Sequence, residues 1–544
     1  ALVGESGAPM FEDIGVNPGG IYFYRVATEA KTHDMGLMGP PVELAVPGVA
    51  NLPPVEISSV TLGDIFPANY KWYLKNPVGQ AVVVNNENVP FHDLTFSFRL
   101  KDFMDFGYDT TIKTLPRRGS VTIPLIATLN NSILGVTEDT PVQAEFSLTY
   151  FDQGRERTAT LTKPLRVYSR NAIVWNDPRR IANFVTPQDP PVVDFAREAL
   201  LSAPADVRTA ALNPNAVAAL NLWDALSAAG VRYFAKPNSP YETVSQDKTF
   251  PVDYTQFPRE TLARKSGQCD DLTTLMVSLL ESAEIPSAIL DYPGHMALMF
   301  DTESQSPERS GLPADWLVKY DGRYWVPVEA TLLGQGFVQA VQKAVYDYKT
   351  LSAQKSARVV DLQQAWAEFE PATLPPASAA PPQPDAKAAA ADFSAAVKTM
   401  FEAEYESLKG QLAAALKADP KDSASRIELG ILEYQAGHKA AARKAFENVL
   451  KADPSNAAAL NDVGNLEFFA GDYVQAAKMY RKAAADSASS GAADPDYSMN
   501  LLKAELKAKN AAAAKKAGEA ATALDSDLTP AVEALLEGSG AQAQ

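Results

Sequence analysis

The chain carries a single cysteine, and the residues around it are of the kinds that make a thiol reactive. Cys269 follows Ser266-Gly267, a pair that breaks regular structure. The residues after it place apolar side chains at helical spacing: Leu272, Leu275, Met276, Leu279 and Leu280. We therefore expect Cys269 at a helix N-terminus, where free backbone N–H groups and the positive end of the helix dipole favour the thiolate. Asp270 and Asp271 oppose this effect electrostatically, although acidic residues are also ordinary stabilisers of a first helical turn.

A histidine and a carboxylate follow the cysteine on predicted strands. His295 opens the second of two short strand-like runs, and Asp321-Gly322 is a strong hairpin signal whose second strand ends at Glu329. In thiol catalysis an imidazole takes the thiol proton, and a carboxylate fixes the tautomer of the imidazole and stabilises its charge. We therefore predict that Cys269, His295 and Glu329 form one site. Asp321 is a rival for the carboxylate, but the turn explains that residue better.

The order of these features resembles the transglutaminase-like branch of the papain-type cysteine enzymes. The resemblance runs from Val252 to Gly334 and includes a Gly-x-Cys-acidic helix start, an Ile-Pro after that helix, a Gly-His strand and an Asp-Gly-x-x-Trp-x-x-x-carboxylate hairpin. It implies that Cys269 is the nucleophile, His295 the general base and acid, and Glu329 the orienting carboxylate. The usual member has Asp-Pro-Thr where this chain has Glu329 followed by Ala330 and Thr.

Stabilisation of an oxyanion is the remaining requirement of such a site. The backbone N–H of Cys269 is the natural donor, and Gln256 and Gln268 are the candidates for an additional side-chain donor, although solvation would explain either glutamine equally well. The other histidines, His33, His92 and His438, lie in three other predicted domains, so a histidine metal cluster is not expected. The sequence also lacks paired thiols and a calcium loop of the EF-hand type. We predict neither a cofactor nor a required metal.

Strand patterns dominate the first third of the chain. Residues 1–50 contain Pro18-Gly19-Gly20-Ile21-Tyr22, a turn followed by a tyrosine-rich strand, which resembles the last strands of a fibronectin type III module. A complete sandwich of that kind needs about twice this length. The pattern therefore predicts a partial module and a chain that starts inside a domain, the alternative being an N-terminal hairpin that leans on its neighbour. Residues 51–175 read as an immunoglobulin-like β-sandwich of normal size.

Helical patterns take over after the sandwich. Residues 176–369 mix helical and strand periods and are predicted to form an α+β domain of the transglutaminase-like type. Residues 370–392 are rich in Pro and Ala and predict a semi-rigid spacer. In 393–544 the segment Leu416–Pro420 recurs 34 residues later as Leu450–Pro454. With its Leu-Gly and Ala-x-x-x-aromatic pairs, this period resembles the tetratricopeptide repeat, which implies a helical solenoid.

Composition limits the classes of partner. A length of 544 residues suggests about three or four domains at roughly 100–200 residues each. The formal net charge of −17 would repel a phosphate backbone, so we do not expect nucleic acid as a partner. No run reaches the roughly 18 apolar residues of a membrane span. The first ten residues lack the basic start and apolar core of a signal peptide, which fits a processed chain or a cytosolic protein.

Two functions remain after these exclusions. The first is an exported thiol acyl-transfer enzyme, either a protease or amidase or a protein crosslinker, whose repeats recruit a protein partner. The second is a catalytically silent scaffold in which sandwiches and repeats bind protein or peptide partners. Carbohydrate binding by the sandwiches has only scattered aromatic residues in its favour. The association of sandwich modules with a transglutaminase-like core predicts a periplasmic or extracellular bacterial location.

Overall fold

A computed structural model describes most of the chain, which divides into two compact units, Ala1–Ala172 and Ile173–Gln544. The described residues are 4–7, 10, 13, 15–16, 20–30, 35–46, 52–236, 241–247, 249, 251–377, 380–382 and 384–538. Among them, no helix combines the length and the apolar character needed to cross a bilayer.

The described part of residues 1–50 forms a hairpin. Strands β1 (Ile21–Tyr24) and β2 (Val42–Ala45) pair antiparallel. Phe23 is 65 % exposed, whereas Tyr22 and Tyr24 on the other face of β1 are half-buried. The alternating strand predicted after the turn is therefore present, whereas Pro18-Gly19 of the predicted turn lies outside the described residues.

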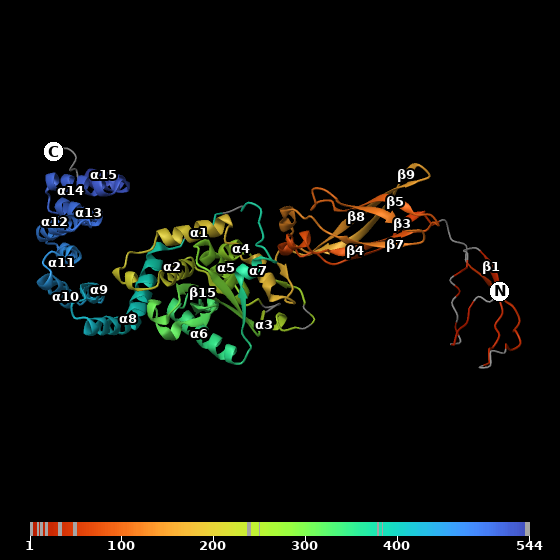
Figure 1. The fold of residues 1–544 in the computed structure, drawn as a ribbon, viewed down its shortest axis with the longest axis horizontal. Helices are drawn as coiled ribbons and strands as arrows, with labels where there is room; N and C mark the ends of the chain where they lie inside the picture. Colours follow the sequence, from red (N-terminus) through yellow and green to blue (C-terminus); the bar gives the residue numbers. More distant parts are fainter. Residues whose placement is uncertain are drawn as a thin grey trace. The chain divides into compact units, whose positions relative to one another are not determined.

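The rest of the first unit is β-rich and contains two antiparallel sheets (Figure 1). The three-stranded sheet has the order β3-β4-β7, and the four-stranded sheet has the order β6-β5-β8-β9. The bounds are Val55–Leu62 for β3, Gly79–Asn85 for β4, Phe91–Leu100 for β5, Tyr108–Leu115 for β6, Ser120–Leu125 for β7, Thr140–Asp152 for β8 and Arg155–Val167 for β9.

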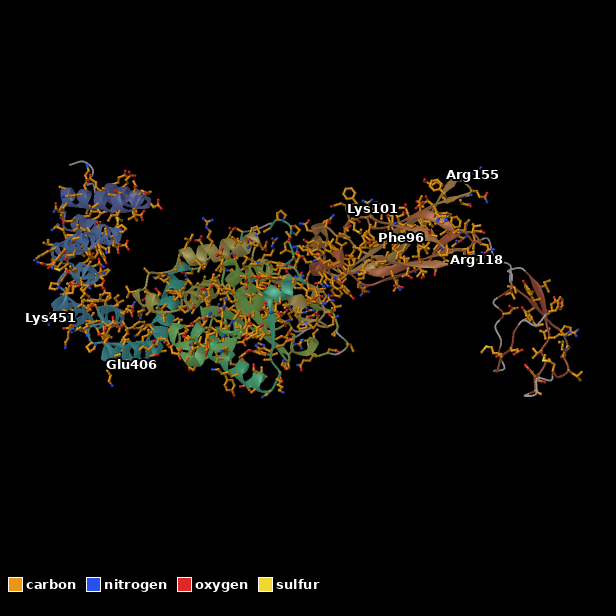
Figure 2. All side chains as sticks on the ribbon, in the orientation of Figure 1. Phe96, Lys101, Arg118, Arg155, Glu406 and Lys451 are labelled. Carbon is orange, nitrogen blue, oxygen red and sulfur yellow. The ribbon has the colours of Figure 1, made fainter. Side chains whose placement is uncertain are left out.

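Side chains alternate between the interior and solvent along these strands, because successive residues of a strand point to opposite faces. In β5, Phe96 and Phe98 are fully buried while Arg99 is exposed. Figure 2 labels Phe96 in the interior of this region and Lys101 on its surface. The alternation of apolar and polar residues that predicted a β-rich region here therefore matches the alternation of buried and exposed side chains.

The central domain of the second unit combines helices with a five-stranded antiparallel sheet of order β16-β17-β15-β14-β18. The buried helix α5 packs against β14 and β15 of this sheet, and α1 and α2 pack against α5. The bounds are Pro190–Leu201 for α1, Pro214–Ala228 for α2, Pro258–Arg264 for α4, Cys269–Ser282 for α5, Ser287–Tyr292 for β14, His295–Ser304 for β15, Val318–Tyr320 for β16, Arg323–Val328 for β17, Phe337–Ala353 for α6, Arg358–Asp361 for β18 and Leu362–Trp366 for α7.

The predicted spacer differs from the structure at both ends. The side chain of Asn183 donates to the backbone oxygen of Glu370 at 2.7 Å, and Arg259 donates to the oxygen of Pro375 at 2.7 Å, so the first part is packed on the central domain. Helix α8 (Ala386–Ala418) already includes the last seven residues of the expected spacer, which ends at Asp392. The physical reason is the run of alanines, the strongest helix formers, with Asp385 as the N-cap.

Helix α8 joins the central domain to the helices that follow it (Figure 1). Its first half buries Phe393, Val397 and Met400, and it packs against both α2 and α9. The following helices pack mainly on their chain neighbours, as in a solenoid. They are α9 (Ser423–Gln435), α10 (Lys439–Ala452), α11 (Ala457–Ala470), α12 (Tyr473–Ser489), α13 (Pro495–Lys507), α14 (Ala511–Leu524) and α15 (Thr529–Gly538).

Glycines at equivalent positions of the repeats let the two helices of a pair approach closely. A Cβ at Gly430 would lie 2.4 Å from the ring of Phe446, and one at Gly464 would lie 2.6 Å from the ring of Tyr480. Both rings are buried, at 2 % exposure. The glycine of each Leu-Gly pair and the aromatic residue of each Ala-x-x-x-aromatic pair therefore pack against each other. The aromatic ring contacts the helix backbone where the glycine has no side chain.

This packing predicts opposite effects for two helical glycines. Gly430→Ala forces the buried Phe446 ring to move and should destabilise the repeats by about 1–3 kcal/mol. Gly410→Ala is the matched control, because nothing lies within 4 Å of its Cβ, and it should stabilise α8 by roughly 0.5–1 kcal/mol. Urea unfolding of the full chain, followed by far-ultraviolet circular dichroism, measures both changes. Equal stability of the two variants would contradict the packing described here.

Candidate functional site

The N-terminus of α5 is held by a buried carboxylate. Asp271, in the first turn, accepts hydrogen bonds from the backbone N–H of Gln268 at 3.0 Å and of Gln256 at 2.7 Å. The side-chain amide of Gln256 donates to the same carboxylate at 2.9 Å, and Lys236 forms an ion pair with it at 3.1 Å. Because these bonds fix both segments that lead into the helix, they determine where Cys269 lies.

His295 and Glu329 are joined directly. Nε2 of His295 lies 2.6 Å from Oε2 of Glu329, and Oε1 of Glu329 accepts hydrogen bonds from the backbone N–H of Thr331 at 3.0 Å and from its hydroxyl at 2.6 Å. Burial by itself would raise the pKa of Glu329, but the bond to His295 and the two bonds from Thr331 outweigh burial and lower the pKa. The carboxylate is therefore charged near neutral pH and holds the imidazole ring in one orientation.

A tight turn places the imidazole. β14 and β15 pair in a register that sets Tyr292 opposite His295, and the two rings stack at 6.4 Å between centroids with 22° between their planes. Gly294, in this turn, has a φ of +74°, a conformation that suits glycine. The ring of His295 is thus supported on one side by an aromatic ring and bonded at its edge to Glu329. Its side chain remains 33 % exposed.

The thiol of Cys269 is buried and lies close to the start of β15, where His295 stands. Cys269 is 4 % exposed, and hydrogen bonding by the backbone of Met296, the residue after His295, acts on its sulfur. Burial raises the pKa of Cys269 well above its usual value, and the charge of Asp270 raises it further, while the backbone bonds from Met296 and Asp270 act in the opposite direction. Among the described residues, no hydrogen bond joins the sulfur to His295.

The two glutamines proposed as oxyanion donors differ. The amide of Gln256 donates to the oxygen of Ser266 at 3.2 Å and to Asp271, and its oxygen accepts from Arg264 at 3.0 Å, so this side chain is fully engaged in holding the helix start. Gln268 is 2 % exposed and its oxygen accepts from the backbone N–H of Tyr241 at 3.4 Å. Its side-chain nitrogen is buried without a hydrogen-bond partner in the described structure. Gln268 is therefore the one with a free donor beside Cys269.

Sequence reasoning missed several residues of this site. Thr331 completes the Glu329 carboxylate, and the two-residue Glu-x-Thr spacing, typical of a side chain that caps a short turn, is the signal that could have found it. Lys236 and Asp253 join Asp270 and Asp271 in a buried charged cluster, for which the sequence carries no local signal. Burial, together with the charge of Asp271, raises the pKa of Asp270 to about 7.

The described residues hold no group of three or more His, Cys, Asp or Glu side chains suited to a metal ion. His92 lies in β5 and His438 directly precedes α10, while His33 falls outside the described residues.

The helices from α9 onward define the second functional element, a stack of antiparallel helix pairs of the helical-repeat class. The tetratricopeptide repeat family matches residues 409–457 and 427–493. This confirms the predicted repeats, and it indicates a protein partner, because such repeats are protein-recognition modules. No curated protein matches the chain. The resemblance of the central domain to transglutaminase-like enzymes stays a prediction.

The charge beside the thiol generates a prediction about its pKa. Asp270→Asn removes a carboxylate that raises the pKa of Cys269 but keeps an oxygen for Thr255, whose hydroxyl donates to Asp270 at 2.7 Å. The pKa of Cys269 should fall, and alkylation of the thiol at neutral pH should become severalfold faster, because the thiolate is the reactive form. The rate of iodoacetamide labelling as a function of pH measures this change.

Glu284→Gln is the control for that experiment, because Glu284 is an exposed acid two residues beyond the far end of α5. It should leave the labelling profile unchanged. A profile of Asp270→Asn that coincides with that of the wild type would show that Asp270 does not act on the thiol.

Proposed function

We propose that the central domain is a thiol acyl-transfer enzyme of the transglutaminase-like type and that the C-terminal repeats recruit its protein partner. The observation that carries the proposal is the 2.6 Å bond between His295 and Glu329 at the turn that also brings a backbone N–H to the sulfur of Cys269. A nucleophile at a helix start, an imidazole and an orienting carboxylate are the parts that such catalysis requires.

The roles follow from which atoms are already engaged. Glu329 occupies Nε2 of His295, so Nδ1 is the nitrogen left to take the proton of Cys269. The sulfur then attacks a carboxamide or peptide carbonyl, and a tetrahedral oxyanion forms. As the carbon–nitrogen bond breaks, the imidazolium gives its proton to the leaving amine and a thioester remains. Water resolves the thioester in a protease or amidase, and a lysine amine resolves it in a crosslinker.

Two donors are the candidates for binding the oxyanion. The backbone N–H of Cys269 lies in the first turn of α5, where N–H groups have no partner within the helix. The buried side-chain nitrogen of Gln268 has no partner within the described structure. A buried donor without an acceptor costs about 1–3 kcal/mol, so its presence next to the nucleophile supports a ligand oxygen as the missing acceptor.

The repeats supply the surface for a protein partner. Phe469 is 61 % exposed, and its ring stacks on Tyr434 at 6.0 Å between centroids. Together with Leu466, Lys439 and Arg443 these rings line a groove of about 230 Å³ on the helical stack. Arg443 is already paired with Glu467 at 2.8 Å, so Lys439 is the exposed cation beside the exposed ring of Phe469 and the half-buried ring of Tyr434. Such a surface suits a protein segment that carries apolar and acidic residues. On this proposal the protein is exported and works in the bacterial periplasm or outside the cell, as its sandwich-like modules suggest.

A catalytically silent scaffold is the second candidate. The observation that favours it is the state of Cys269, which is 4 % exposed, has a raised pKa and makes no hydrogen bond to His295 in the described structure. In a scaffold the fold would persist for assembly through the repeats and the β-rich unit, and the thiol would be a buried apolar residue. The two candidates differ in whether Cys269 forms an acyl adduct.

The decisive experiment is acylation of the full chain by a thiol-directed acyl probe, read by intact mass. Because Cys269 is the sole thiol, an adduct locates itself. Cys269→Ala should abolish the adduct, and Glu329→Gln should slow acylation by about 100-fold or more, because the imidazolium loses its counter-charge. Glu329→Asp tests the carboxylate length and should retain part of the rate.

Glu303→Gln is the matched control for the carboxylate variants, because Glu303 is an exposed acid on the same strand as His295. It should acylate like the wild type. The enzyme proposal fails, and the scaffold stands, if the folded wild type forms no adduct or if Glu329→Gln acylates at the wild-type rate.

A further inference from the structure

A short segment lies over the turn that carries His295. This segment, which we call the strap, comprises residues 241–247 and begins with the single helical turn α3 (Tyr241–Val244). Gly294 shows how closely the strap approaches, since a Cβ at that position would lie 2.6 Å from the side-chain nitrogen of Gln246 and 3.2 Å from Cα of Glu242. The strap therefore packs against the residue next to the candidate general base.

One side chain anchors the strap. Tyr241 is 2 % exposed, and its hydroxyl donates to Asp291 at 3.2 Å. Its ring packs edge to face on Trp175 at 4.9 Å between centroids, and its backbone N–H donates to the side-chain oxygen of Gln268, the residue before the thiol, at 3.4 Å. The anchor thus reaches both the helix start and the strand before His295.

The remainder of the strap is loosely attached. Its other described residues are exposed or half-buried. The hydroxyl of Ser245 donates to the oxygen of Tyr241 at 2.7 Å, and Gln246 donates to the oxygen of Glu242 at 2.8 Å, so these bonds stay within the strap. Segments with few buried apolar contacts open at low free energy without global unfolding. Within the described structure, Tyr241 is the one buried side chain that holds this segment, so the segment can lift while the rest of the domain stays folded.

We propose that the strap is a cover over the Cys269–His295 corner, that Tyr241 is its latch, and that an acyl substrate reaches the thiol only when the strap lifts. The cover explains why the exposures of the two candidate catalytic residues differ. Cys269 is 4 % exposed, whereas the side chain of His295 is 33 % exposed. The proposal gives the proposed enzyme a closed resting state, and for that purpose it rests on the proposed function. The accessibility of the thiol tests it independently of any catalysis.

The latch is tested by alkylation of Cys269 in three variants of the full chain. Tyr241→Phe keeps the ring and removes only the bond to Asp291, which should speed iodoacetamide labelling about tenfold. Tyr241→Ala removes the buried ring as well and should speed labelling about 100-fold. Tyr346→Ala, an exposed tyrosine on α6, is the control and should label like the wild type. Circular dichroism verifies that each variant is folded.

The wild type supplies a measurement that needs no variant. If the thiol is labelled through local opening of the strap, the labelling rate should depend only weakly on urea concentration well below the unfolding transition. If it is labelled through global unfolding, the rate should rise with urea as steeply as the equilibrium constant of unfolding does. The proposal is overturned if labelling of the wild type shows the global dependence throughout, if the wild type labels as fast as free cysteine, or if folded Tyr241→Ala labels no faster than Tyr346→Ala.

The outcomes separate this inference from the enzyme proposal. If the Tyr241 variants are labelled faster but no acyl adduct forms, the strap proposal is supported and the enzyme proposal is contradicted. If an acyl adduct forms equally fast in the wild type and in Tyr241→Ala, the enzyme proposal is supported and the strap proposal is contradicted.

Discussion

The buried carboxylate of Asp271 is the interaction on which the candidate site depends. It gathers the backbone of Gln268 and of Gln256, and it is balanced by the ammonium group of Lys236. A buried charge is tolerated only when it is paired and hydrogen-bonded. Removal of Lys236 would leave the carboxylate without a counter-charge, and loss of any of its N–H donors would raise the cost of burying it. The position of Cys269 in space is therefore fixed by an electrostatic requirement and not by the chemistry of the thiol.

The same constraint explains why the acids next to the thiol play different roles. Asp271 has four donors. Asp270 accepts a hydrogen bond from Thr255 and lies 3.9 Å from Lys236, and within the described structure its other oxygen is buried without a hydrogen-bond partner. Burial and the charge of Asp271 raise the pKa of Asp270 to about 7, so Asp270 titrates near neutrality. Because its folded-state pKa lies above the value of an unfolded aspartate, the native state binds this proton more tightly, and its contribution to stability is present at low pH and lost as pH rises through about 7.

The sequence permitted prediction of whatever depends on period and local signals. Such signals predicted the helix that starts at Cys269, the strand that starts at His295 and the hairpin that leads to Glu329. They also predicted the repeats, in which the ring of Phe446 packs on Gly430. The free donor of Gln268 and the bond between Tyr241 and Asp291 depend on burial or on partners distant in the chain, which no period encodes. The cap by Thr331 had a local signal in the Glu-x-Thr spacing, which was overlooked. The spacer was misjudged at Ala386 because a Pro/Ala composition was given more weight than the helix propensity of the alanine run.

In the proposed triad, Glu329 would stand in the place of the usual aspartate. Glu329 precedes the short helical turn η8 (Ala330–Leu332) and receives two bonds from Thr331 on one oxygen, which fixes the extra methylene and leaves the other oxygen for His295. With Glu329 and Asp270 both near the thiol, the local charge in the covered state favours the neutral thiol over the thiolate. A thiol of this kind would be activated by proton transfer to His295 when substrate arrives, and not by a preformed ion pair, so uncovering and deprotonation would be successive steps.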